Sequence, residues 1–379
     1  MNGFRLQLAP VASELARHHE VVVLAYRWPE QTGAAPPGVE LHTIDRPRRS
    51  VLRRGLTWLT SPLPLGAATT TGPMAAAAHR LLTERGFDVL HVAGWSLAGL
   101  ADELPALPRV LTAFDANHLN YQAESDIGSF LRRWAYSREA KRVVRFERSA
   151  YAGFNSVVVV TREDADALRR LDPRLSLEVA PNGVDADVFA PRRDIAPESG
   201  LIVMTGAMQW GPNIAAATFL AREVFPLVRA ARPDARVALV GRRPGAQVRA
   251  LNELDGVTVT GDVPDIRDWL WRAQVFACPM MSGTGIKNKL LEALACGVPS
   301  VATPLACQGM EVVHERELLV ADTADEIASE IVRLLDDPPL RERLGAGGRS
   351  HVVARHSWES VAGLYERLLR EAQAQPARG

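Results

Sequence analysis

Short apolar runs alternate with stretches of helical periodicity along most of the chain. Residues 21–24 are Val-Val-Val-Leu, a run typical of a strand buried on both faces. Apolar positions at helical spacing precede it over residues 4–18. Further strands are predicted at 39–44, 89–91, 110–113 and 156–160, and further helices at 75–85 and 129–152. Strands that alternate with helices predict a parallel sheet with helices on both faces.

The second half of the chain repeats this alternation. Residues 181–185, Pro-Asn-Gly-Val-Asp, are typical of a turn, and a polar stretch follows at 194–200, so we place a domain boundary there. Strands are predicted at 201–205, 236–240, 257–260, 275–279, 299–302 and 318–321, and a helix at 324–335. The predicted domains are 1–185 and 186–357, followed by a helical segment, 358–379, that can pack back on the first domain.

The first domain lacks one expected strand. Asn2-Gly3 resembles the glycine turn that follows the first strand of a nucleotide-binding unit, yet no strand precedes it. In the usual doubly wound order that strand is central, so its absence leaves a gap between strands 21–24 and 89–91. We expect either an upstream extension of about 10–25 residues with a short apolar strand, without which the chain is poorly stable, or a sheet that closes in another way.

Composition narrows the class of protein. A chain of 379 residues is too long for one ordinary core, which agrees with two domains. Basic and acidic residues number 44 each, and this zero formal charge argues against a nucleic-acid-binding protein. The three cysteines show no paired spacing, and no run of about 18 apolar residues occurs, so we expect a cytoplasmic protein without a membrane-spanning helix.

The segment 279–303 is the richest in chemistry. Its loop 282–285, Ser-Gly-Thr-Gly, opens a predicted helix whose first amide groups are free to bind an anion. Lys287 is predicted in the first turn of that helix, where a lysine is unfavourable unless an anion is present. Glu292 follows about a turn and a half later.

This segment resembles the signature of the retaining group 1 glycosyltransferases, whose GT-B fold has two Rossmann-like domains facing each other across a cleft. Glu292 matches the second glutamate of the family's pattern of two glutamates separated by seven residues, which implies hydrogen bonds to the nucleotide ribose. Thr284 stands where the first glutamate is expected. The variant Gly-Thr-Gly-Ile-Lys-Asn-Lys is similar to a subgroup associated with exopolysaccharide biosynthesis.

The resemblance also assigns other donor-binding positions. The loop 205–213 lies where many relatives place an arginine and a lysine for the diphosphate, and this chain has neither there. We expect Lys287 or Arg242 to supply that charge instead. The loop 261–265 resembles one whose backbone contacts the base. The implied donor-binding residues are Gly206, Asn213, Arg242, Val263, Gly283, Thr284, Gly285 and Glu292.

In the first domain the resemblance extends only to the outline of the fold. Phe114 holds the position where relatives place a histidine directed at the donor sugar, with Asp115 next to it and His118 close by. The candidate catalytic residues are therefore Asp115, His118 and Lys287. Asp115 is also suited to capping the following helix, and histidines such as His118 are often structural.

The resemblance implies a hexosyltransferase-type enzyme. It would move a sugar from an NDP-sugar to a glycan, lipid-linked or small-molecule acceptor, with retention and without a metal or other cofactor. No Asp-x-Asp metal motif occurs at a suitable position.

Two other classes of protein remain open. One is a sugar-nucleotide epimerase of similar fold, which would need acid and base carboxylates and a histidine in the cleft. The other is a weak or inactive nucleotide-sugar-binding protein, which Thr284, Phe114 and the missing strand would favour.

An arginine-rich run precedes an apolar stretch in the first domain. Such a run is usually a solvated surface, but basic charge beside tryptophan and leucine also favours peripheral contact with the inner face of an anionic membrane. The run comprises Arg46, Arg48, Arg49, Arg53 and Arg54, followed by Leu56, Trp58 and Leu59. A second basic group comprises Arg138, Lys141, Arg142 and Arg145.

Overall fold

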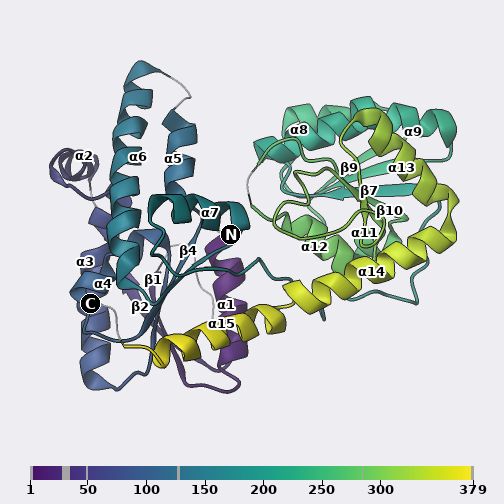
Figure 1. Cartoon of the computed structure of the whole chain (residues 1–379). Coiled ribbons are helices and arrows are strands. Elements are labelled where there is room, and N and C mark those ends of the chain that lie inside the picture. The colour runs from purple at the N-terminus through teal and green to yellow at the C-terminus, as the bar shows by residue number, and fades with distance from the viewer. Residues whose placement is uncertain (1–2, 28–34, 48–49, 126–128, 284, 377–379) are drawn as a thin grey trace. The chain divides into compact units, whose positions relative to one another are not determined.

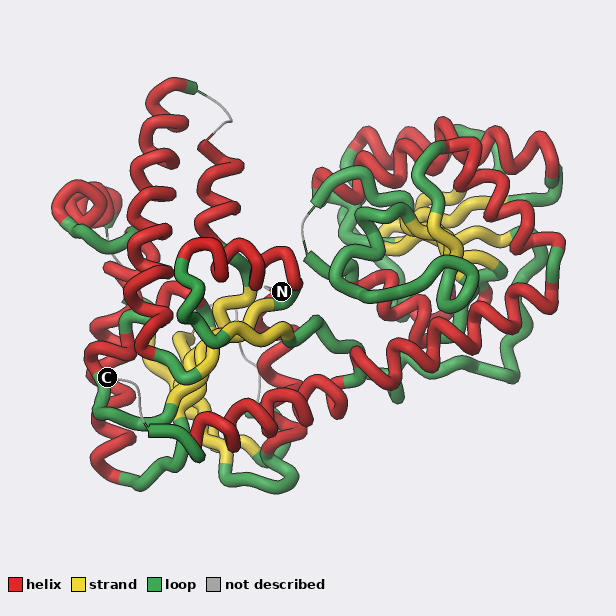
Figure 2. The backbone as a smooth tube through the Cα atoms, viewed as in Figure 1, coloured by secondary structure: helices red, strands yellow, loops and turns green. Residues whose placement is uncertain are grey.

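The computed structural model describes residues 3–27, 35–47, 50–125, 129–283 and 285–376. It divides into two compact units, Met1–Ala180 with Val361–Gly379, and Pro181–Ser360. In each unit parallel strands are covered by helices, drawn in yellow and red in Figure 2. The predicted fold class, α/β with two Rossmann-like units, is confirmed. The first boundary lies slightly before the predicted position at 185.

The second unit contains one six-stranded parallel sheet in the order β12-β11-β10-β7-β8-β9. Numbered within the unit, this is the doubly wound order, in which the direction of winding reverses between β7 and β10. β7 and β10 are buried along their whole length, which explains their uninterrupted apolar runs. The strands are β7 (Leu201–Thr205), β8 (Arg236–Val240), β9 (Val257–Gly261), β10 (Val275–Cys278), β11 (Ser300–Ala302) and β12 (Leu319–Val320).

The helices of the second unit cover both faces of this sheet (Figure 1). They are α8 (Gly211–Phe219), α9 (Phe225–Ala231), α10 (Ala246–Arg249), α11 (Arg267–Arg272), α12 (Asn288–Ala295), α13 (Ala324–Asp336) and α14 (Pro338–His356). A capping box at Thr323 and Glu326 begins α13.

The strands of the first unit form two separate sheets. β1 pairs with β2, and the other four strands pair in the order β3-β4-β5-β6, with no described strand between β1 and β3. This is the gap that the sequence predicts. The two-stranded sheet is joined to the rest of the unit by side-chain packing and not by strand pairing, because Leu24, Tyr26 and Ile44 pack against the main hydrophobic core. The strands are β1 (Val21–Arg27), β2 (Val39–Asp45), β3 (Leu90–Ala93), β4 (Arg109–Phe114), β5 (Ser156–Val159) and β6 (Leu177–Val179).

The last helix of the chain, α15 (Trp358–Gln373), belongs to the first unit from Val361 onward. The hydroxyl of Thr112 on β4 donates to Tyr365 Oη over 3.1 Å, so α15 is tied directly to the four-stranded sheet. The other helices of this unit are α1 (Gly3–Leu15), α2 (Val51–Thr60), α3 (Leu65–Glu84), α4 (Leu100–Glu103), α5 (Asn117–Ser125), α6 (Phe130–Ala150) and α7 (Arg162–Leu171). Among the described residues, no helix combines the length and the hydropathy needed to cross a membrane.

Candidate active site

Two loops meet where the strand order of the second unit reverses. One leads from β7 to α8 and the other from β10 to α12. In doubly wound sheets, ligands bind at this point, beyond the carboxyl ends of the strands. Neither α8 nor α12 has a side-chain cap at its N-terminus. Two positive helix ends therefore converge on one place, an arrangement that favours an anion.

Two glycines allow the loops after β7 and β8 to approach each other. Gly206 has φ 158° and Gly241 has φ 151°. A Cβ atom built on Gly241 would stand only 1.7 Å from the carbonyl oxygen of Gly206. A Cβ atom on Gly206 would stand 2.8 Å from Nδ2 of Asn213 on α8. A side chain at Gly241 would push the two loops apart, and one at Gly206 would displace the side chains of Asn213 and Lys289.

Lys289 is the cation at the reversal point. From the first turn of α12 its ammonium donates to Asn213 Oδ1 on α8, and it lies 3.5 Å from the sulfur of Met280. The ammonium also stands 3.2 Å from where a Cβ atom of Gly206 would lie. Burial lowers the pKa of Lys289, while the nearby Glu292 opposes that shift. Lys289 thus carries a half-buried positive charge between α8 and α12.

Lys287 has a different position from the one the sequence predicts. α12 begins at Asn288, so Lys287 is its N-cap residue rather than part of its first turn. Its ammonium turns back and donates to the carbonyl oxygens of Gly283 (3.0 Å) and Gly285 (2.5 Å). The structure therefore places Lys287 as a buried support of its own loop, whereas Lys289, which the sequence analysis did not single out, reaches Asn213 on α8. The sequence does contain a signal for Lys289. It lies three residues before Glu292, and residues three apart share a helix face.

Glu292 lies one turn after Lys289 on the same face of α12. It is half-buried, and burial raises the pKa of its carboxyl group to about 7, with Lys289 acting in the opposite direction. A carboxylate beside an ammonium at the reversal point suits a ligand that presents hydroxyl groups next to phosphate.

The remaining predicted donor residues lie in the loops that follow β8, β9 and β10. A Cβ atom on Gly283 (φ 104°) would lie 3.5 Å from Pro212, so the α12 loop packs against the start of α8. Arg242 is exposed at the end of β8, and its carbonyl oxygen accepts from the amide of Met208 over 3.0 Å. Val263 is half-buried in the loop after β9. Thr284 lies outside the described residues.

In the first unit, Asp115 follows the end of β4. Phe114 before it has φ 71°, a left-handed conformation that is strained for an aromatic residue. Asp115 is half-buried, and burial together with the neighbouring Asp164 raises the pKa of its carboxyl group to about 6. A carboxyl that changes its charge near neutral pH is suited to proton transfer.

His118 is buried, with 4% of its surface exposed. Its Nδ1 lies 2.6 Å from Oε2 of Glu147, whose own side chain is fully buried and whose carboxyl pKa is raised by burial. The structure therefore places His118 inside the first unit as the partner of Glu147 on α6.

Two family models match the chain and together span both units. One, described as "Glycosyltransferase Family 4", matches residues 2–188. The other, described as "Glycosyl transferases group 1", matches residues 199–337, which hold both loops, Lys289 and Glu292. The chain belongs to the group 1 glycosyltransferases.

Curated relatives of this glycosyltransferase include enzymes that act on phosphoinositol lipids. It is 32% identical to the "GDP-mannose-dependent monoacylated alpha-(1-6)-phosphatidylinositol monomannoside mannosyltransferase" of Corynebacterium glutamicum, over 53% of this chain and only 57% of that relative. It is 26% identical to the "GDP-mannose-dependent alpha-(1-6)-phosphatidylinositol monomannoside mannosyltransferase" of Mycobacterium tuberculosis, over 86% of this chain and 80% of that relative.

Solved structures show the fold of this glycosyltransferase. HepE from Anabaena, crystallised with UDP and glucose, matches with a TM-score of 0.66 at 14% identity, over 98% of this chain and 96% of that chain. The fold is therefore the two-domain GT-B fold, as the sequence predicts.

Proposed function

We propose that this glycosyltransferase moves a hexosyl group from an NDP-sugar to an acceptor, with retention of the anomeric configuration. The observation that carries the proposal is the position of Lys289 between α8 and α12, with Glu292 one turn away. The GDP-mannose dependence printed for two relatives, and the UDP and glucose in the HepE crystal, support a nucleotide-sugar donor.

In this proposal the donor diphosphate lies at the reversal point of the second unit. The leaving NDP gains negative charge as the bond to the sugar breaks. Lys289 and the N-termini of α8 and α12 are already in place to stabilise that charge, so little reorganisation is needed. Gly206 allows the diphosphate to approach the backbone closely, and Lys287 holds the Gly283–Gly285 loop in shape.

Glu292 would accept hydrogen bonds from the ribose hydroxyl groups, and the loop around Val263 would contact the base. We propose that these protein charges serve the diphosphate without a metal ion. The described residues contain no group of three or more metal-ligating side chains of the His, Cys, Asp and Glu types.

The first unit would bind the acceptor, with Asp115 available for proton transfer. The acceptor would be a glycan, a lipid-linked glycan or a small molecule, and a role in polysaccharide biosynthesis would follow from the first two. The curated relatives named above favour the lipid-linked class.

A donor panel tests the function. GDP- and UDP-sugars would be screened by thermal shift, because a ligand that binds only the folded state raises its stability. Each stabilising donor would then be incubated with and without acceptors, and the products identified. Transfer with retention is the expected result. Conversion of the sugar nucleotide without an acceptor would indicate an epimerase, and binding without any product would indicate an inactive binding protein.

Donor affinity should rise with pH through about 7. The pKa of Glu292 in the folded protein lies above its usual value, so the protonated form prevails at pH 6 and the ionised form at pH 8. If only the carboxylate accepts from ribose, the affinity for a nucleotide sugar should increase by up to about tenfold between these pH values, as measured by calorimetry. In the absence of donor, the raised pKa of Glu292 also affects the free energy of unfolding. The protonated carboxyl group stabilises the folded protein at low pH, and this contribution is lost as pH rises through 7.

The matched control for this pH dependence is Glu292→Gln, which keeps the shape of the side chain and cannot ionise. Its affinity should be lower at pH 8 and independent of pH. The diphosphate of a nucleotide sugar does not titrate in this range, so it does not contribute to the slope. An equal pH slope in wild type and in Glu292→Gln would contradict the ribose assignment.

A further inference from the structure

Exposed apolar side chains gather in two neighbouring segments of the first unit. More than half of the large apolar residues that are exposed in the described part of the chain lie in residues 51–63 and 130–134. On α2, Leu52 is 85% exposed and Leu56 is 61% exposed, and on α6 Phe130 is 81% exposed. The others are Val51, Leu59, Leu63, Leu131 and Trp134. Such a concentration marks an interaction surface.

The leucines of α2 form one face of the helix. At 100° per residue, Leu52, Leu56 and Leu59 fall within an arc of about 60°, and Arg54 points to the opposite side. None of the ten residues of α2 is buried. The helix therefore turns its apolar face to the surroundings instead of to its own unit, the reverse of an ordinary surface helix.

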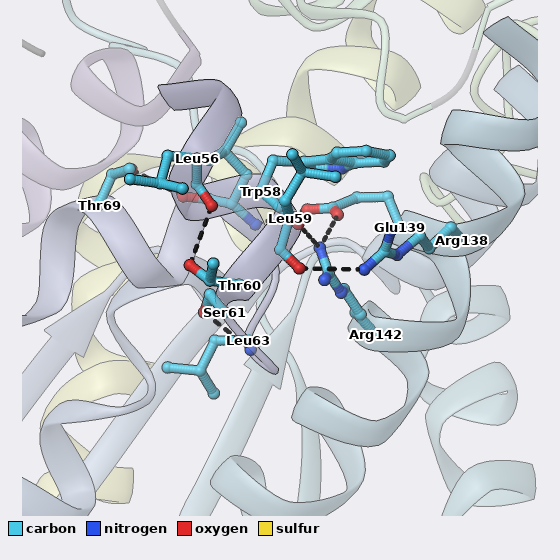
Figure 3. Close-up of polar contacts among 11 residues, drawn as sticks. Leu56, Trp58, Leu59, Thr60, Ser61, Leu63, Thr69, Arg138, Glu139 and Arg142 are labelled. Atoms are coloured by element: carbon cyan, nitrogen blue, oxygen red, sulfur yellow. Dashed lines mark hydrogen bonds and ion pairs between the residues drawn. The ribbon is translucent and has the colours of Figure 1, made fainter. Parts of the chain in front are cut away.

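α2 is fixed to α6 by its C-terminal end. Arg142 donates to the carbonyl oxygen of Trp58 over 2.8 Å, and Arg138 donates to that of Leu59 over 3.3 Å (Figure 3). The Cζ atom of Arg138 lies over the Trp58 ring, 4.7 Å from the ring centroid. The centroids of the Trp58 and Trp134 rings are 5.7 Å apart. Figure 3 shows Leu56 on the side of α2 away from these arginines. Cations at a helix C-terminus stabilise it, so α2 is held in place while its leucines stay free.

The exposed charge on these two helices is positive. α2 contains no acidic residue, and the two acidic residues of α6, Glu139 and Glu147, are both buried. The exposed cations of the two helices include Arg53, Arg54, Arg133, Lys141 and Arg145. Arg48 and Arg49 of the run lie outside the described residues. Leucine, phenylalanine and tryptophan mixed with arginine and lysine are typical of helices that lie in a membrane interface.

We propose that α2 and the first turns of α6 form a docking face for an anionic membrane. The docking face is defined by Leu52, Leu56, Leu59, Phe130, Leu131 and Trp134, with Arg53 and Arg133 as the exposed cations beside them. The apolar side chains enter the headgroup–acyl boundary, and the cations contact lipid phosphates. A second copy of the chain fits less well, because a two-fold interface would bring these cations against one another.

Vesicle sedimentation tests the docking face directly. The whole chain should bind vesicles of phosphatidylcholine with phosphatidylglycerol, and bind phosphatidylcholine alone far more weakly. Binding should also fall as salt rises from 0.1 to about 0.5 M. Leu52→Ser, Leu56→Ser and Leu59→Ser together should weaken binding about tenfold or more, because three side chains lose their apolar burial in lipid. The melting temperature should not change, since none of the three is buried in the fold.

The matched control changes three exposed apolar residues of the second unit, Leu227, Val313 and Val353, to serine. This variant should bind vesicles like wild type. Unchanged binding by the α2 triple variant, or equal binding to neutral and anionic vesicles, would overturn the proposal. A wild-type dimer in ultracentrifugation that the triple variant abolishes, with no vesicle binding, would assign the face to self-association instead. No donor is needed, so failure here is distinct from failure of the proposed function.

Discussion

Replacing Lys289 with methionine should lower the turnover of the preferred nucleotide-sugar donor by about 100- to 1,000-fold. Lys289 places its ammonium between Asn213 and Gly206 at the reversal point of the second sheet. Methionine has a similar length and no charge. The leaving diphosphate would then lose its half-buried cation, while the helix N-termini would still bind part of the charge. Steady-state kinetics with a saturating acceptor measures the change.

Two further variants make this test specific. Lys287→Met should have the smaller effect on turnover, because the Lys287 ammonium donates hydrogen bonds to the carbonyl oxygens of Gly283 and Gly285. Lys289→Arg should restore little, because a planar guanidinium is larger than the ammonium that fits between Asn213 and Gly206. An exposed cation of the second unit, Arg316, gives a control in Arg316→Met, which should leave turnover unchanged. A greater loss from Lys287→Met than from Lys289→Met would refute the assignment.

Replacing Gly241 with alanine should destabilise the second unit by about 2–6 kcal/mol, the sum of an overpacking cost and a backbone-strain cost. The new Cβ atom would stand 1.7 Å from the carbonyl oxygen of Gly206, and the residue would have to keep φ 151°. The obstacle is backbone rather than a flexible side chain, so the ends of β7 and β8 must separate. Donor binding should be lost with the stability, because the same separation moves Gly206 away from Lys289.

Gly245→Ala is the matched control for this substitution. It lies in the same loop, nothing stands within 4 Å of its added Cβ atom, and its φ is −69°. Its unfolding free energy, measured by denaturant titration, should stay within about 0.5 kcal/mol of wild type. Equal stability of the two variants would show that the close approach of Gly206 and Gly241 is not needed for the fold.

The second sheet could be predicted almost residue by residue because its central strands β7 and β10 are buried on both faces, and turn residues separate the other strands. The helices of the first unit were harder to predict. α3 begins at Leu65, whereas the sequence predicts a start at 75. Gly72-Pro73 is typical of a helix break, yet both residues lie inside α3. α2 has no apolar stripe turned toward its own unit, and the contacts that hold it come from Arg138 and Arg142, far away in the sequence.

In the candidate site, the sequence placed the start of the helix too early. α12 starts one residue after Lys287, whose ammonium turns back to its own loop, whereas Lys289 donates to Asn213 on α8. Composition held a further hint, since the chain contains only three lysines among its 44 basic residues, and two of them are Lys287 and Lys289. The burial of His118 against Glu147 could not be foreseen, because the two residues lie on different helices.

We propose that the reversal point of the second unit binds the diphosphate of a nucleotide-sugar donor. Calorimetry with GDP- and UDP-sugars on the wild-type chain and on Lys289→Met tests it most directly. We predict that at least one donor binds the wild type and that Lys289→Met weakens this binding by about tenfold or more, a loss of about 1.4 kcal/mol or more. Binding of equal strength in the two proteins, or no binding of any nucleotide sugar to the folded wild type, would contradict the account.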